Sequence, residues 1–156
     1  MVRQLLDEGH QTVTLPLRGR SMRPFLEDER DKALLALPET LHPEQPGNSP
    51  GHPALQVGDV VLAEVSPAFY VLHRLIGIDG DALTLLGDGN LNVEHCHRQD
   101  VLAVATAFYR KGRSRADSVT GLKWRTYSWC WMRLRPLRRY LLFALHPHIP
   151  RLWMRS

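Results

Sequence analysis

Between residues 58 and 109 the chain is a series of short apolar runs separated by turn-forming residues, and this pattern restricts the possible folds. The apolar runs lie at residues 60–65, 69–78, 82–86 and 101–109. Turn signals separate them, most clearly Asp79-Gly80-Asp81, which is typical of a β-hairpin. Strands of this length with a turn every eight to twelve residues predict a mainly β body of the barrel or sandwich type.

Two shorter runs come earlier in the chain. Residues 11–18 read as a first strand, and residues 3–10 are compatible with one or two helical turns before it. Residues 32–37, Lys-Ala-Leu-Leu-Ala-Leu, favour helix by composition. They are bounded by a charged turn and by Pro38, so their length predicts a buried strand instead. Residues 38–57 contain five prolines and predict an exposed loop.

Charge is distributed unevenly along the 156 residues. Residues 1–109 hold 15 Asp and Glu against 8 Lys and Arg, whereas residues 110–156 hold 12 Lys and Arg against Asp117 alone. The composition, 44% apolar and 23% charged, is that of a globular protein. We therefore divide the chain into an acidic β body, residues 1–112, and a basic aromatic C-terminal extension, residues 113–156.

The extension interleaves tryptophan and tyrosine with arginine from residue 122 onward. We expect two short helices, broken near Pro136 and ending before Pro147. Three roles are open. The tryptophans could pack against the body with the arginines outward, which we favour. Residues 122–156 could instead contact an anionic membrane surface. Contact with nucleic acid is the least favoured, because a basic patch alone is weak evidence.

The cysteines and the apolar segments indicate the compartment. Two cysteines, Cys96 and Cys130, are too few for a disulfide framework and predict a reducing environment. The first 13 residues lack the apolar region of a secretory signal. No run approaches the roughly 20 apolar residues of a membrane span. We expect a cytoplasmic protein that contacts a membrane, if at all, through its extension.

Ser21 is a candidate nucleophile. It follows the first predicted strand and Gly19, and it precedes Pro24, which has no backbone N–H and disfavours helix before it. A stiff turn of this kind presents a small hydroxyl outward, as a nucleophile requires. A lone serine in such a place more often caps a short helical turn.

His73 and Asp88 are two further candidates. His73 shares one face of its predicted strand with Val71 and Leu75, where a histidine usually satisfies a core hydrogen bond. Asp88, between two glycines, is most simply a turn residue bonded to its own backbone. Each of these residues is weak evidence alone, but their order along the chain is informative.

Three blocks in that order resemble the serine peptidases that include signal peptidases and the self-cleaving LexA-type repressors. The nucleophile box of that family resembles Gly19-Arg20-Ser21-Met22-Arg23-Pro24. Its general-base box resembles Gly58-Asp59-Val60-Val61 followed by residues 71–77, and its third box resembles Gly87-Asp88-Gly89-Asn90. The resemblance covers about residues 12–109 and implies a LexA/signal-peptidase-like fold.

The resemblance also implies roles for individual residues. His73 stands where bacterial members carry lysine, as in archaeal and endoplasmic-reticulum signal peptidases. Ser21 would then be the nucleophile and His73 the general base. Asp88 or Glu94 would orient the imidazole; the third-box match favours Asp88. The Ser21 N–H would serve the oxyanion, and Gly19 removes the hydroxyl that some bacterial members place there.

Together these matches imply a serine endopeptidase that cleaves an extended peptide or leader sequence without a cofactor. Only 20 residues precede Ser21, which leaves no room for a membrane anchor or a DNA-binding domain, so we expect a soluble, stand-alone catalytic body. Two other functions remain open. The chain could be a catalytically inactive peptide-binding module, or an adaptor that acts through residues 113–156.

Metal binding is not predicted. Residues 94–97 read Glu-His-Cys-His, but in a strand the two histidines would face one side and Cys96 the other. Neighbouring residues of this kind rarely complete a tetrahedral site, and no second ligand cluster accompanies them. We predict that His146-Pro147-His148 is a turn at the end of a helix.

Overall fold

The computed structural model describes residues 12–17, 21–27, 29–36, 55–113 and 115–145, without the side chains of Arg139, Phe143 and Leu145. Four of the sequence predictions lie outside these residues. They concern the helical turns of residues 3–10, Gly19, all but the last residues of the 38–57 loop, and the turn of residues 146–148.

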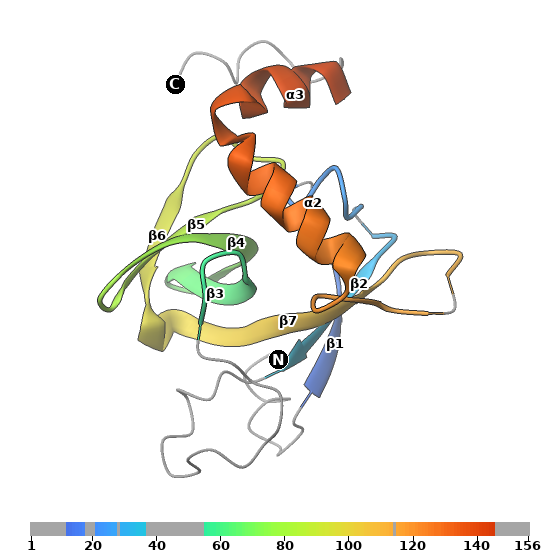
Figure 1. Cartoon of the computed structure of the whole chain (residues 1–156). Helices are drawn as coiled ribbons and strands as arrows, with labels where there is room; N and C mark the ends of the chain where they lie inside the picture. The colour runs from blue at the N-terminus through green and yellow to red at the C-terminus, as the bar shows by residue number, and fades with distance from the viewer. Residues whose placement is uncertain (1–11, 18–20, 28, 37–54, 114, 146–156) are drawn as a thin grey trace.

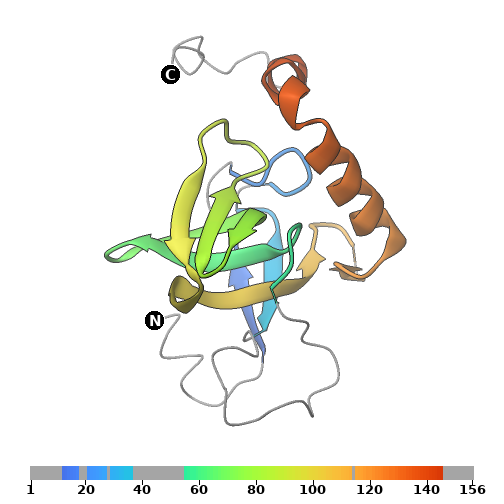
Figure 2. The same cartoon turned by 60° about the vertical axis from the view of Figure 1, so that its left-hand side comes forward.

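Eight strands form one antiparallel sheet (Figures 1 and 2). They are β1 Thr12–Pro16, β2 Lys32–Ala36, β3 Val60–Ser66, β4 Phe69–Asp79, β5 Ala82–Leu86, β6 Glu94–His97, β7 Val101–Tyr109 and β8 Asp117–Ser118. The mainly β prediction is confirmed, and so are the strands predicted within residues 11–18, 32–37 and 60–109. The short, polar strands β6 and β8 were not predicted.

The sheet is open. Its order is β1-β2-β7-β3-β4-β5-β6, with β8 added to β7, and within the described part of the chain no pairing joins β1 to β6. The expectation of a barrel-type body is therefore wrong in one respect, because the sheet does not close into a barrel. The sheet is nevertheless irregular. Register shifts interrupt four of its pairings, for example between Leu75 and Gly77 of β4, and such bulges bend and twist a strand.

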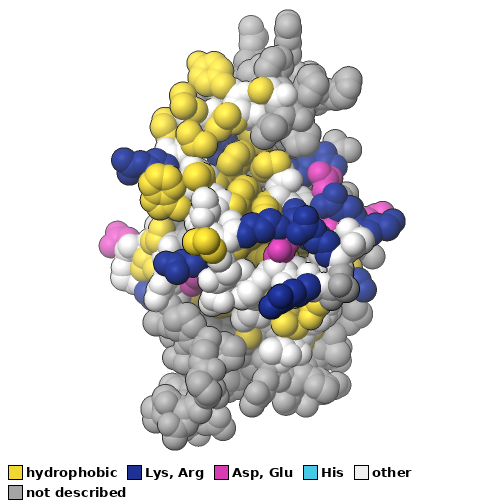
Figure 3. Space-filling model, turned by 45° about the vertical axis from the view of Figure 1, so that its right-hand side comes forward, with side chains coloured by type: hydrophobic (Ala, Val, Ile, Leu, Met, Phe, Trp, Pro, Cys, Tyr) yellow, Lys and Arg dark blue, Asp and Glu magenta, His cyan; other side chains and the backbone are white. Residues whose placement is uncertain are grey.

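The extension forms the two predicted helices, α2 Leu122–Arg133 and α3 Arg138–Leu145. A 3₁₀ turn, η3 Arg135–Leu137, separates them and contains Pro136, which cannot donate the backbone hydrogen bond of a continuous helix. None of the described helices is long and apolar enough to cross a bilayer. On the face that Figure 3 shows, apolar side chains gather in the upper part and basic side chains beside them.

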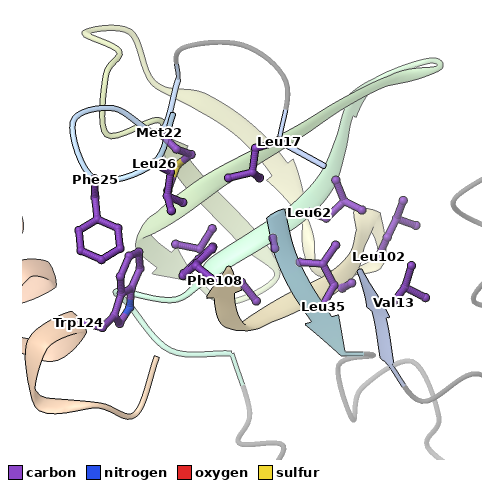
Figure 4. Packing of buried hydrophobic residues seen from close by; sticks show 14 residues of the cluster. Val13, Leu17, Met22, Phe25, Leu26, Leu35, Leu62, Leu102, Phe108 and Trp124 are labelled. Carbon is purple, nitrogen blue, oxygen red and sulfur yellow. The ribbon is translucent and has the colours of Figure 1, made fainter. Parts of the chain in front are cut away.

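Two apolar clusters lie on opposite faces of the strands, as the period of two dictates. In β3, for example, Val61 belongs to one cluster and Leu62 to the other. The Leu62 cluster extends from the sheet to the turn after β1 and to α2 (Figure 4). The ring of Trp124 lies 4.6 Å from that of Phe108 and 4.9 Å from that of Phe25. The prediction that tryptophans of the extension pack against the body is therefore confirmed for Trp124.

We expect Trp124→Ala to lower the free energy of unfolding by about 3–5 kcal/mol, because it removes a buried indole and leaves a cavity. Trp129→Ala on the same helix is the matched control, since Trp129 is 64% exposed. It should change the free energy of unfolding by no more than about 0.5 kcal/mol. Urea denaturation followed by circular dichroism measures both, and equal effects would contradict the packing.

Candidate active site

A pocket of about 670 Å³ opens between β1 and the first half of β4. Ser21 and His73 both line it, although they are far apart in the sequence. The other polar or charged side chains that line it are Glu27, Tyr70, Asn90 and Glu94. The rest of its wall is apolar and comes from Leu15, Pro16, Leu17, Met22, Leu26, Leu35, Leu62, Phe69, Val71 and Leu72.

Ser21 begins a turn that is anchored in the core. Met22, Phe25 and Leu26 are buried in the apolar cluster beneath it (Figure 4), and the Leu26 N–H donates to the Met22 carbonyl at 3.1 Å. Farther along, the buried carboxylate of Asp31 accepts the Glu27 N–H at 3.0 Å. The turn that carries Ser21 is therefore fixed by packing on one side and by hydrogen bonds on the other.

His73 lies on β4, and Val71 and Leu75 are buried on either side of it along the strand. The imidazole is 3% exposed, and its Nδ1 lies 2.6 Å from Oε2 of Glu94 at the start of β6. Neither atom has another partner among the described residues. Glu94 is therefore the residue that faces His73.

Burial and charge act in opposite directions on His73. Burial penalises the imidazolium and lowers the pKa of His73 below its ordinary 6.5. The carboxylates of Glu94 and, more weakly, Asp88 raise that pKa, but burial is the larger effect. The imidazole is therefore neutral near pH 7, and contact between Nδ1 and Glu94 favours the tautomer that has its free electron pair on Nε2.

Gly87 shows how close Ser21 and His73 are. A Cβ on Gly87 would lie 2.6 Å from the Ser21 carbonyl oxygen and 3.0 Å from His73 Nε2, so these two atoms are at most about 5.6 Å apart. Nε2 of the imidazole therefore lies near the backbone of Ser21. The structure contains no hydrogen bond between the side chains of these two described residues. Catalytic hydrogen bonds of this kind often tighten only when substrate binds.

Among the described residues no hydrogen bond or ion pair joins Asp88 to His73, so the geometry favours Glu94 over Asp88 as the acid that faces the imidazole, contrary to the preference from the sequence. Its carboxylate is fully buried and accepts two hydrogen bonds from Arg74, at 2.8 and 2.7 Å. The hydroxyl of Tyr127 donates to the same carboxylate at 2.9 Å. Asp88 lies in the loop after β5, where its carboxylate contacts Arg74 and also Tyr127 of α2. Glu94 lies on the next strand, β6, and lines the pocket.

Asp88 nevertheless supports Ser21 through the backbone of its own loop. The Gly89 N–H donates to the Ser21 carbonyl at 2.7 Å. From the extension, Trp131 Nε1 donates to the Asp88 carbonyl at 3.2 Å. Sequence reasoning missed Arg74 and Trp131. An arginine inside the apolar run of β4 is the signal that could have pointed to a buried acidic partner.

The Glu-His-Cys-His segment alternates as expected, with His95 and His97 exposed and Cys96 buried. Burial raises the pKa of the Cys96 thiol to about 11. Within the described ranges, no three His, Cys, Asp or Glu side chains are grouped so that they could hold a metal ion. The pocket itself offers the Ser21 hydroxyl, the His73 imidazole and the Glu94 carboxylate, together with the side chains of Glu27, Tyr70 and Asn90.

We expect Gly87→Ala to lower the free energy of unfolding by about 1–3 kcal/mol, because the added methyl group would overlap the Ser21 carbonyl, a backbone atom that cannot turn away. Gly77→Ala is the control, since a Cβ there would meet Thr84 at 3.5 Å, an ordinary contact. Urea denaturation of the two variants tests this. Equal stability would mean that Ser21 and Gly87 are farther apart than described.

Comparison with known proteins identified no relative of this chain. No family model matches it, and neither a curated protein nor a solved structure does.

Proposed function

We propose that this protein is a serine endopeptidase of the signal-peptidase-like type, with a LexA/signal-peptidase-like fold. The observation that supports this most is the meeting of Ser21 with the His73–Glu94 pair in one pocket. The resemblance to the three sequence boxes supports the same residues. Asp88, which matches the third box, then acts by positioning the loop that contacts Ser21.

The reaction would follow the steps of nucleophilic catalysis. His73 Nε2 removes the Ser21 hydroxyl proton as Oγ attacks the peptide carbonyl. The same proton then passes to the leaving amine, and an acyl-serine ester remains. Water attacks that ester with His73 again as the base, which releases the carboxylate product and restores Ser21. Glu94 stabilises the imidazolium through Nδ1, and the Ser21 N–H serves the oxyanion.

Two unpaired strand edges border the pocket. Among the residues that the structure describes, β1 pairs only with β2, and residues 69–73 of β4 pair only with β3, because β5 begins its pairing at Arg74. An extended peptide could add a strand at either edge and place its side chains on the apolar wall between them. We therefore propose that the substrate is an extended peptide or leader segment with apolar side chains near the cleaved bond.

Ser21→Ala should lower the rate of peptide cleavage at least about 10⁴-fold, because it removes the nucleophile. The measurement is cleavage of a degenerate peptide library, read by mass spectrometry. Ser66→Ala is the control, since Ser66 is an exposed serine at the end of β3, and it should cleave as the wild type does. Unchanged cleavage by Ser21→Ala would refute the proposal. Binding of library peptides without cleavage by the wild type would indicate a peptide-binding module instead.

The pH dependence tests the role of Glu94. Because His73 acts as a neutral base, kcat/KM should fall as the pH drops through the pKa of His73, below 6.5. Glu94→Gln removes a charge that raises this pKa, so the acid limb of the pH profile of kcat/KM should move to lower pH. The plateau should also fall by roughly 10²–10⁴-fold.

Asp79→Asn, which removes an exposed carboxylate from β4, the strand that carries His73, is the control for Glu94→Gln. It should leave both the limb and the plateau unchanged. A Glu94→Gln variant whose acid limb stays in place would show that Glu94 does not act through His73.

A further inference from the structure

A second pocket, of about 370 Å³, lies where β1, β2 and the end of β7 meet. Its polar wall is strongly basic. Five cationic side chains line it together with Thr14, Tyr109 and Gly112, namely Arg30, Lys32, Arg110, Lys111 and Arg113. A wall that collects charge of one sign creates a positive potential that attracts anionic groups.

Two carboxylates offset part of this charge. Arg30 pairs with Asp31 at 2.7 Å, and Arg110 pairs with Asp117 at 2.9 Å. The other three cations, Lys32, Lys111 and Arg113, are exposed and have no carboxylate partner among the residues that the structure describes. The pocket therefore has a surplus of positive charge at its mouth.

The helices of the extension leave large apolar side chains in solvent. Leu122, Trp129 and Tyr140 are 80%, 64% and 70% exposed, and Leu137 is also exposed. Exposed arginines accompany them, and the Arg133 guanidinium lies over the ring of Trp129 at 5.8 Å. Residues 118–156 contain no Asp or Glu. This outer surface of α2–α3 is therefore both apolar and exclusively basic in its charge.

The basic pocket and the outer surface of α2–α3 adjoin each other. Lys123, in the first turn of α2, lies 3.1 Å from Asp117, which also pairs with Arg110 of the pocket. The two regions also meet at Phe25, because the charged groups of Arg110 and Lys123 both lie over its ring. Figure 3 shows apolar and basic side chains next to each other on one face of the molecule.

We propose that this face binds an anionic phospholipid surface. The phosphate groups of the lipids would enter the basic pocket, and Trp129 and Tyr140 would lie at the level of the headgroups. Exposed aromatic side chains together with arginines are typical of proteins that lie on a membrane interface. Nucleic acid would use the cations but leave the apolar side chains in water. The inference does not depend on the proposed peptidase activity.

The test is flotation of the full chain with vesicles of phosphatidylcholine, with or without phosphatidylglycerol. The protein should float only with the anionic vesicles in about 0.1 M salt. It should be released in about 1 M salt, where the screening length falls from about 10 Å to about 3 Å. The double variant Lys111→Gln/Arg113→Gln should bind about fivefold more weakly for each charge lost. Arg113→Lys keeps the charge and should bind as the wild type does.

Trp129→Ala should weaken binding several-fold, because membrane affinity scales with the apolar area that is buried. Val57→Ser, which alters an exposed apolar residue outside the helices, is the control and should bind normally. Ser21→Ala should also bind normally, so a failure of the proposed activity does not affect this test.

Three results would overturn the proposal. The first is equal flotation with neutral and anionic vesicles, and the second is no flotation at all. The third is normal binding by both variants, Trp129→Ala and the double variant Lys111→Gln/Arg113→Gln. Binding of duplex DNA that is lost in the double variant, without flotation, would assign the face to nucleic acid instead.

Discussion

The buried ion pair between Arg74 and Asp88 is the interaction on which the arrangement of the site depends. Both side chains are fully buried, and two charges in such a place are tolerated only when paired and hydrogen-bonded. Arg74 also donates to the Gly58 carbonyl at 2.9 Å and to the Ser128 hydroxyl. The pair therefore joins β4, the loop after β5 and α2, and that loop contacts the Ser21 carbonyl.

Arg74 and His73 are neighbours on β4, so they point to opposite faces of the sheet. His73 faces the pocket, and Arg74 faces the rings of Trp124 and Tyr127 on α2, at 5.1 and 5.7 Å. One strand thus connects the candidate base to the C-terminal extension. The basic aromatic extension is, for this reason, part of the support of the site as well as an outer surface.

Much of the fold could be predicted from local pattern. Strands β3, β4, β5 and β7 followed from alternating turns and apolar runs, and Lys32–Ala36 followed from its length despite its helical composition. Sheet closure could not be predicted, because it depends on whether β1 and β6, distant in sequence, pair with each other. The choice between Asp88 and Glu94 failed for a similar reason. It depended on Arg74 and Tyr127, which reach Asp88 from other elements.

An open sheet is exposed to other copies of the same molecule, since an unpaired edge offers hydrogen bonds to any extended chain. Here β1 has only five residues and ends at Pro16, which has no N–H to donate. The opposite edge, β6, has four residues, and His95 and His97 are exposed on it. Both edges are short, so neither offers a long template for a continuous intermolecular sheet, and this limits fibrous self-association.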